Sequence, residues 1–286
     1  YIEPSQIDHE LRSGKVSAVI VFSSDFDRRL EQVSTGLPST PIIQLVVDAS
    51  NVNTAGASTA YLQEILLGTA SLQAMFDTRM LFNPQMKSAY NFVPGIMGLI
   101  VILVCAMMTS VSIVREKEVG TMEVLLVSPV RPTKIIFAKM IPYFVISCVV
   151  LIIILLLSYY LLNVPMSGGV WGIFSVSLLY VLLSLSLGLL VSIVAKTQVM
   201  ALLISAMVMM MPMMLLSGML FPIENSPKFF QVLSNIIPTR WYVEAIRKMM
   251  IQGSPFLAVW KEFTILLGMT ITFLGVSLIK FNDKLE

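Results

Sequence analysis

The sequence predicts an α-helical polytopic membrane protein that carries an N-terminal α/β lobe. Its 286 residues are 56% hydrophobic with a mean hydropathy of +0.84, which is more apolar surface than a soluble protein of this size carries. Residues 92–286 contain five apolar runs, each about long enough to cross a bilayer core, for which a helix needs ~20 residues. Residues 1–91 are mixed and polar enough to form a separate folded domain.

The N-terminal region alternates strand and helix patterns. Runs of apolar, mostly β-branched residues predict strands at Val16–Phe22 and Ile42–Val47. A helix is expected at Asp25–Val33, and a longer one from Asn51 to about Leu81 because apolar residues recur there on one helical face. The pattern therefore predicts one β-α-β-α lobe.

Five membrane spans follow, and no charged residue lies in the interior of any of them. The turn at Asn163–Gly169 is uncharged, and the loop at Lys196–Gln198 carries one positive charge. We expect the spans at Phe92–Val114, Met140–Leu162, Val170–Ala195, Val199–Phe221 and from about Phe263 to Lys280.

The charges of the short loops predict an orientation. The loop Arg115–Lys139 holds five basic residues, and Lys196 and the tail with Lys284 fall on the same side, which should be cytoplasmic by the positive-inside rule. The same alternation places the N-terminal lobe outside, where something must have translocated it. Either an earlier span, which would make six in the whole protein, or a removed signal peptide would account for the translocation of the lobe.

The loop Arg115–Lys139 also has the pattern of a docking element. Met122, Leu125 and Leu126 fall on one face of a helix, acidic residues lie among them, and Pro129 ends the helix. A short helix at the inner membrane surface suits a contact for a cytoplasmic protein. An ordinary charged loop fits the same spacing.

The segment Pro222–Ile251 has the pattern of two amphipathic helices separated by Pro238, both too short to span a bilayer. In the second helix, Glu244 stands four residues from both Arg240 and Lys248, which predicts two ion pairs on one face. A re-entrant hairpin and an amphipathic loop resting on lipid headgroups both fit this pattern.

The lack of charge at membrane depth restricts the function classes. Ion-coupled transporters and intramembrane enzymes need ionisable groups there, so the energy for uphill transport should enter from outside the membrane. Sodium coupling through carbonyls and hydroxyls remains an alternative. The 286 residues contain no G-x-x-x-x-G-K-[ST] phosphate loop, so we expect ATP hydrolysis on a separate subunit.

Other composition features argue against nucleic-acid and metal binding. The net charge of +2 is too small to indicate a nucleic-acid partner. Cys105 and Cys148 each lie within an apolar run, and His9 has no Cys or His near it in sequence, so no metal site is expected. No catalytic residues are expected either.

The fourth span is rich in methionine and contains Pro212, which should kink it. Methionine is flexible and polarizable and suits a surface that accepts varied apolar ligands. It also serves simply as lipid-facing bulk, and the sequence leaves both interpretations open.

Three stretches resemble a known family. Ser112–Lys139, which contains R-E-K-E-x-G-T-M-E-x-L-L-V-S-P, resembles the first cytoplasmic loop of permease subunits of ABC exporters of the ABC transporter-2 class. Ser217–Arg247 is similar to that family's extracytoplasmic re-entrant hairpin. GKVSAVIVFSSDF and LVVDASNVNTA resemble the external domain of a bacterial subgroup with a large extracytoplasmic domain. The likeness covers essentially the whole chain and lacks only the family's first span.

The resemblance implies a permease that forms a homo- or heterodimer and binds a cytoplasmic ATPase subunit, which holds ATP and Mg²⁺. Arg115–Ser128 would be the coupling helix. Its ATPase-facing side would comprise Arg115, Glu116, Glu118, Gly120, Met122 and Glu123.

The resemblance also implies a translocation path at the dimer interface, lined by the first and fourth spans, and an outer closure by the hairpin Pro222–Ile251. The path candidates are Met207, Met210, Met211 and Met214. The outer-gate candidates are Pro222, Pro238, Trp241, Glu244 and Arg247.

The expected function is therefore that of the transmembrane subunit of an ATP-driven exporter in the bacterial cytoplasmic membrane. Apolar spans with methionine predict a hydrophobic or amphipathic cargo. A periplasmic adaptor is a further candidate partner. The alternatives are a membrane-anchored extracytoplasmic sensor or scaffold, which would explain the lobe, and an ion-coupled secondary transporter.

Overall fold

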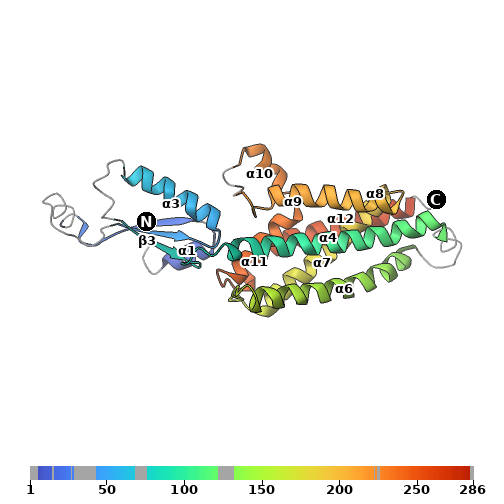
Figure 1. Cartoon of the computed structure of the whole chain (residues 1–286), viewed down its shortest axis with the longest axis horizontal. Helices are drawn as coiled ribbons and strands as arrows, with labels where there is room; N and C mark the ends of the chain where they lie inside the picture. Colours follow the sequence, from blue (N-terminus) through green and yellow to red (C-terminus); the bar gives the residue numbers. More distant parts are fainter. Residues whose placement is uncertain are drawn as a thin grey trace. The chain divides into compact units, whose positions relative to one another are not determined.

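The computed structural model describes residues 6–14, 16–26, 28, 43–67, 76–121, 132–221, 223 and 226–283 (Figure 1). The chain forms two compact units, Tyr1–Asn91 and Phe92–Glu286. Helix α4 (Ser88–Val119) begins in the first unit and continues into the second.

The first unit contains a three-stranded sheet in the order β1-β2-β3. β1 (Ala18–Phe22) runs antiparallel to β2 (Ile43–Asp48), with Ile20 opposite Leu45, and β2 runs parallel to β3 (Phe76–Leu81). The central position suits β2, whose nearly continuous apolar run can be buried on both faces. Leu45 is accordingly 1% exposed.

Among the described residues of this unit, helices α1 (Ile7–Arg12) and α3 (Val52–Leu67) accompany the sheet. Asn51 caps α3, because its Oδ1 accepts hydrogen bonds from the backbone N–H groups of Asn53 and Thr54 at 3.1 and 3.3 Å. The core comprises Leu45, Val47, Ala49 and Ala55, with Ala18, Ile20, Leu62, Met80 and Met86 packed against it.

The predicted helix from Asn51 to about Leu81 is confirmed over Val52–Leu67 and is wrong over Phe76–Leu81, and residues 68–75 lie outside the described residues. Residues 76–81 form β3 instead, which pairs with the second edge of β2 and thereby satisfies backbone groups that would otherwise lack partners. The predicted helix Asp25–Val33 lies mostly outside the described residues, and α1 was not predicted at all.

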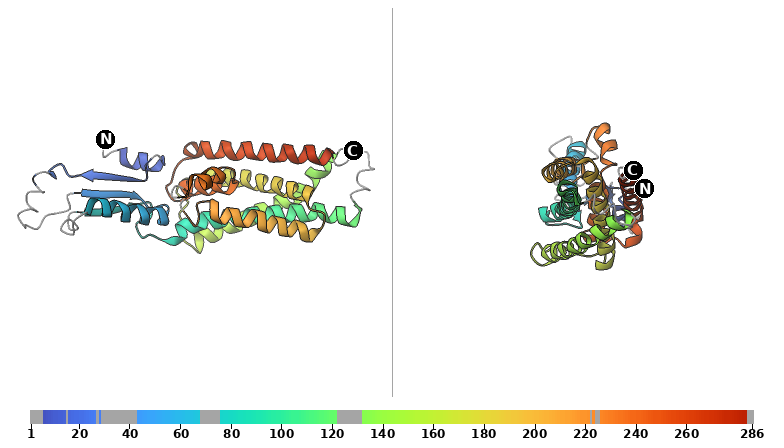
Figure 2. Two further views of the ribbon diagram at one scale, coloured as in Figure 1. Left: turned by 90° about the horizontal axis from the view of Figure 1, so that it is seen from above. Right: turned by 90° about the vertical axis from the view of Figure 1, so that its right-hand side faces the viewer.

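The second unit is a helical bundle, and its long helices run side by side in Figure 1 and in the left view of Figure 2. Five described segments are long and apolar enough to cross a membrane, which confirms the predicted number of spans. The elements are α4, α6 (Pro132–Tyr160), α7 (Val170–Val194), α8 (Gln198–Ile204), η3 (Ser205–Met210), α9 (Met211–Leu216), α10 (Lys228–Ser234), α11 (Pro238–Met250), η5 (Phe256–Val259) and α12 (Trp260–Asp283).

Helix α7 lies at the centre of the bundle. Its most apolar stretch is 83% buried, against 22% for those of α6 and α12. Gly188 allows α4 to approach α7 closely, because a Cβ atom there would lie 2.7 Å from the carbonyl oxygen of Ala106. α6 and α12 instead leave apolar side chains such as Ile152 and Ile271 exposed, as expected of helices that face lipid.

The fourth span is not one regular helix. Its middle segment, η3, is a π-helix, and Pro212 follows it at the start of α9. Proline lacks the N–H group that an α-helix needs and its ring crowds the carbonyl four residues earlier. A wider turn just ahead of the proline accommodates both, so the predicted kink takes the form of a π-helical segment.

Candidate functional site

The candidate functional site begins at the C-terminal end of α4. The resemblance implies a coupling helix over Arg115–Ser128, but residues 115–119 continue α4 without a break. The helix ends at Gly120, whose φ of 81° lies in the left-handed region that favours glycine, and the Gly120 N–H donates to the Lys117 carbonyl at 3.3 Å. Met122 and Glu123 lie outside the described residues.

Three side chains connect this end of α4 to three other helices. Glu116 forms an ion pair with Lys139 of α6. Lys117 Nζ donates to the backbone carbonyl of Ser192 in the last turn of α7, where a positive charge is favourable. These contacts fix the position of α4 along its axis relative to α6 and α7.

The third connection joins α4 to the fourth span. Glu118 Oε2 accepts hydrogen bonds from the backbone N–H and the side-chain Nε2 of Gln198, at 3.2 and 2.8 Å. Gln198 is the first residue of α8, and Thr197 caps that helix by accepting from the Met200 N–H at 3.2 Å. A displacement of the α4 end therefore acts on α6, α7 and α8 together.

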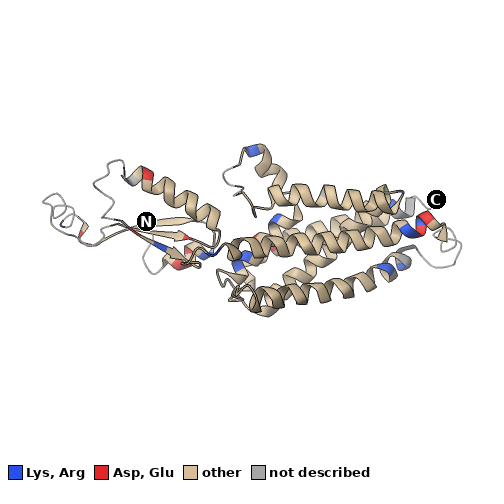
Figure 3. Cartoon of the chain, in the orientation of Figure 1, with Lys and Arg blue, Asp and Glu red and all other residues tan. Residues whose placement is uncertain are grey.

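A cavity of about 630 Å³ lies beside these contacts. Its wall combines charged and apolar side chains from α4 and α6, with Gln198 also contributing. Basic residues gather near this end of the bundle, where α4 ends and α6 begins (Figure 3). Six of the lining residues are Met108, Val111, Ser112, Arg115, Lys139 and Tyr143.

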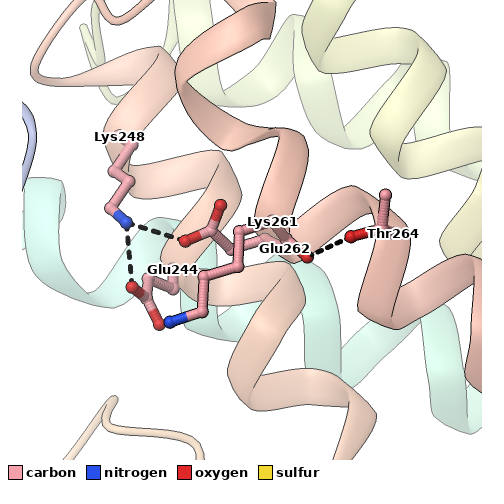
Figure 4. A network of polar contacts seen from close by, with 5 residues as sticks. All are labelled: Glu244, Lys248, Lys261, Glu262 and Thr264. Carbon is pink, nitrogen blue, oxygen red and sulfur yellow. Dashed lines mark hydrogen bonds and ion pairs between the residues drawn. The ribbon is translucent and has the colours of Figure 1, made fainter.

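The opposite end of the bundle holds a second charged cluster, on α11 and α12. Lys248 Nζ lies 2.9 Å from Glu244 Oε1 and 2.8 Å from Glu262 Oε1 (Figure 4). The side chains of Lys248 and Glu262 are 14% and 2% exposed. Glu262 Oε2 is buried without a hydrogen-bond partner among the described residues.

The pKa values of this cluster favour the charged forms. Burial raises the pKa of Glu244, but the Lys248 ammonium beside it outweighs that effect and leaves the pKa below its ordinary value. Burial likewise lowers the pKa of Lys248, but Glu244 and Glu262 outweigh it and raise the pKa. The pair is therefore ionised across the neutral range.

Trp241 links the two amphipathic helices. Its Nε1 donates to the Asn235 carbonyl at 3.0 Å, and the charged groups of Arg240 and Lys261 lie 5.2 and 5.6 Å from its ring centroid. Arg240 also donates to the side chains of Ser234 and Asn235. The first turn of α11 is thus held to the end of α10.

A buried pair of tyrosines joins α11 to the centre of the bundle. The rings of Tyr180 and Tyr242 stack with centroids 4.1 Å apart and planes 9° from parallel. The Tyr180 hydroxyl lies 2.8 Å from Thr239 Oγ1 and 3.1 Å from the Gly98 carbonyl of α4, and the Tyr242 hydroxyl lies 3.0 Å from Ser177 Oγ of α7.

The predicted outer-gate residues are distributed as follows. Pro222 is outside the described part of the chain. Pro238 occupies the first turn of α11, which confirms that it separates two short helices, α10 and α11. Trp241 donates to the Asn235 carbonyl at the end of α10, and Glu244 pairs with Lys248 on its own helix. Arg247 Nη2 donates to the Gly218 carbonyl at 3.4 Å, after the fourth span.

The predicted path residues share one side of the fourth span. Met207 and Met211 are both 70% exposed, and Met210 is 43% exposed. Met214 is half-buried. Met213, on the other side, is 4% exposed, so Met207, Met210 and Met211 face away from their own bundle and Met214 lies at the edge of that side.

Sequence reasoning missed Glu262, Tyr180 and Tyr242. A charged residue directly ahead of the last apolar run is a weak signal for Glu262. A tyrosine in the middle of an apolar run needs a hydrogen-bond partner, which is a usable signal for Tyr180. Within the described ranges, no group of three or more His, Cys, Asp or Glu side chains is arranged to hold a metal ion.

Comparisons with known proteins cover nearly the whole chain. The sequence model of the family described as "ABC-2 family transporter protein" matches residues 2–279. The chain is 27% identical over 288 residues to "Probable multidrug ABC transporter permease YbhS" of Escherichia coli (strain K12), with 97% of this chain and 75% of that protein covered.

Two further relatives extend the comparison. "Inner membrane transport permease YhhJ" of Escherichia coli (strain K12) is 28% identical over 305 residues, covering 99% of this chain and 78% of that protein. "ABC transporter G family member 20" of Dictyostelium discoideum is 29% identical over 204 residues, covering 71% of this chain and 28% of that protein. No solved structure matches the chain.

Proposed function

The chain belongs to the ABC-2 family of transporter proteins, and from this membership we propose that it is the transmembrane subunit of an ATP-driven exporter. The family match confirms the resemblance noted in the loop Arg115–Lys139, and five apolar helices support a multi-pass membrane protein. ATP and Mg²⁺ bind to a separate cytoplasmic ATPase subunit. Two permeases, alike or different, pair around the translocation path.

The observation that carries this proposal is the set of contacts at the end of α4. Glu116, Lys117 and Glu118 join that end to α6, α7 and α8. An ATPase that presses on the following segment, which contains Gly120, Met122 and Glu123, therefore displaces four helices as one body. Such a movement switches the path from inward to outward access.

The orientation follows from the loop charges. Arg115, Lys139 and Lys196 lie on one side of the membrane, which is the cytoplasmic side by the positive-inside rule. The N-terminal lobe, residues 1–91, is then extracytoplasmic and the C-terminus cytoplasmic. The relatives named as Escherichia coli permeases support placement in a bacterial inner membrane.

The exposed methionine side of the fourth span supplies the path. Met207, Met210 and Met211 point away from their own bundle and Met214 lies at the edge of that side, so a second permease can complete a channel around them. Flexible, polarizable side chains adapt to cargo of different shapes. A hydrophobic or amphipathic cargo is consistent with the word "multidrug" in the name of one relative.

The helices α10 and α11 close the path on the outer side. α11 is held to α7 by the Tyr180–Tyr242 stack and to α12 by the Lys248–Glu262 pair. Arg247, at the end of α11, reaches the backbone of Gly218 beyond the fourth span. A movement of the fourth span is therefore passed directly to the outer closure.

Charge reversal at the inner end of α4 tests the proposal. An affinity-tagged permease purified from its host should retain an ATPase subunit, identified by mass spectrometry. The double variant E116K/E118K should lose this subunit, because its acidic surface becomes basic. Size-exclusion chromatography checks that the variant remains folded.

A charge-swap variant separates the two roles of Glu116, which also pairs with Lys139. In E116K/K139E the ion pair is restored in reverse. If Glu116 acted only through its pair with Lys139, this variant should bind the ATPase subunit as the wild type does. We expect it not to regain wild-type binding. A folded E116K/E118K permease that still retains the ATPase subunit would contradict the coupling assignment.

A further inference from the structure

The cavity of about 630 Å³ at the inner end of α4 is lined by three charged side chains, Arg115, Glu116 and Lys139. Lys139 pairs with Glu116 across one wall. Arg115, by contrast, is exposed and has no ion-pair partner among the residues that the structure describes. These three side chains give the cavity wall one uncompensated positive charge.

The cavity also extends from the level of the lipid headgroups into the hydrocarbon region of the membrane. Arg115 directly follows the apolar run 92–114, so it stands at the level of the lipid headgroups. Val111 and Met108 lie four and seven residues deeper on the same helix, or roughly 6 and 10 Å at 1.5 Å per residue. Both line the same cavity, which therefore extends along α4 into the hydrocarbon region.

The wall formed by α6 shows the same change from a charged residue at the headgroup level to less polar residues deeper in the membrane. On α6, Lys139 directly precedes the apolar run 140–162, and Tyr143 lies one turn deeper. A tyrosine at this depth places its ring in the hydrocarbon and its hydroxyl near the headgroups. Ser112 adds a second hydroxyl at a similar depth on α4.

We propose that this cavity binds an anionic phospholipid of the surrounding leaflet. The phosphate lies at Arg115 and Lys139, within reach of donors such as Ser112, and an acyl chain lies along Met108 and Val111. Basic pockets between membrane helices on the cytoplasmic side are suited to anionic headgroups. A soluble phosphate would use the basic rim alone, whereas the lipid matches both the charge and the depth of the cavity.

A bound lipid would bridge α4 and α6 beside the Glu116–Lys139 pair. It would hold these helices at a fixed separation, next to the segment on which the ATPase is proposed to press. The proposal depends on the assigned function only for the choice of leaflet, which is the cytoplasmic one by the loop charges.

The test uses the purified permease without any ATPase, so that its outcome is independent of coupling. Native mass spectrometry measures how much palmitoyl-oleoyl phosphatidylglycerol the permease retains, compared with phosphatidylethanolamine that carries the same acyl chains. We expect the wild type to retain phosphatidylglycerol preferentially. The R115Q variant should bind phosphatidylglycerol about five- to tenfold more weakly than the wild type, since one cation near a membrane surface contributes about 1 kcal/mol.

Lys196→Gln is the matched control. Lys196 is an exposed cation on the same proposed side of the membrane, but it does not line the cavity. K196Q should retain phosphatidylglycerol as the wild type does. An equal loss in K196Q and R115Q, or no loss in R115Q, would overturn the proposal.

A third variant tests the depth of the site without changing charge. Met108→Trp should fill the apolar part of the cavity and reduce phosphatidylglycerol retention, while Arg115 and Lys139 remain. Soluble glycerol 3-phosphate in excess should not displace the lipid from the wild type. Unchanged retention in M108W, or displacement by glycerol 3-phosphate, would show that the site binds the phosphate alone.

Discussion

Lys248 Nζ on α11 lies 2.8 Å from Glu262 Oε1 on α12, and the Glu262 side chain is 2% exposed. The pair joins an amphipathic helix to the last membrane span across the turn between them. Because the Glu262 side chain is buried, removal of the Lys248 ammonium would take away the cation beside it.

Replacement of Lys248 by Met should destabilise the second unit by about 3 kcal/mol, because it leaves Glu262 and Glu244 without their common cation. Thermal unfolding of the purified protein in detergent measures the effect. Lys261→Met, which removes an exposed cation over Trp241, should cost less than about 1 kcal/mol. K248M/E262Q should recover part of the loss, and equal stability of K248M and K261M would refute the role of the pair.

The same cluster predicts a pH dependence of the unfolding temperature. Glu244 has a lowered pKa, so its contribution is present above the ordinary value of 4.5 and is lost as the pH falls through the folded value. Lys248 has a raised pKa, so its contribution is present below 10.5 and is lost as the pH rises through the folded value. Scanning calorimetry should show a plateau between these limits.

Gly188→Ala should separate α4 from α7. The new Cβ atom would lie 2.7 Å from the Ala106 carbonyl oxygen and 3.0 Å from its Cα, and backbone atoms cannot turn aside as a side chain can. A loss of about 1–3 kcal/mol is expected from overpacking. Gly268→Ala is the control, because nothing lies within 4 Å of its Cβ position. If both variants unfold at the same temperature, the close approach of α4 has no energetic importance.

Tyr180→Phe should leave the buried Thr239 hydroxyl without its tyrosine partner, at a cost of about 1–3 kcal/mol. The double variant Y180F/T239V removes both polar partners and should be closer to the wild type. Unfolding temperatures of the single and double variants check this. A double variant that is less stable than Y180F would show that the hydroxyl pair has little importance.

The membrane spans could be predicted because each is a long apolar run, and this signal lies entirely within the residues of the span itself. Pro238 and Gly120 are also local signals, since one begins a helix and the other permits the left-handed conformation that ends one. The first span is expected to end at Val114 because charged residues begin at Arg115, but α4 continues to Val119, since charged residues continue a helix as readily as apolar ones.

Features that depend on distant pairing could not be predicted. β3 exists because β2 has a second edge to be paired, and nothing within residues 76–81 specifies that partner. The spacing of four residues predicts the pair of Lys248 with Glu244, but Glu262, 14 residues along the chain, has the more buried side chain. The stack of Tyr180 on Tyr242 likewise requires the packing of α11 against α7.

Transport by the reconstituted permease tests the central claim most directly. The purified permease and its co-purifying ATPase are placed in liposomes, and movement of an amphipathic dye is followed with ATP, without ATP, and with an imposed proton or sodium gradient. Export should require ATP and the ATPase subunit, because the apolar runs contain no charged residue in their interiors. Transport by the permease alone on an ion gradient would contradict the account.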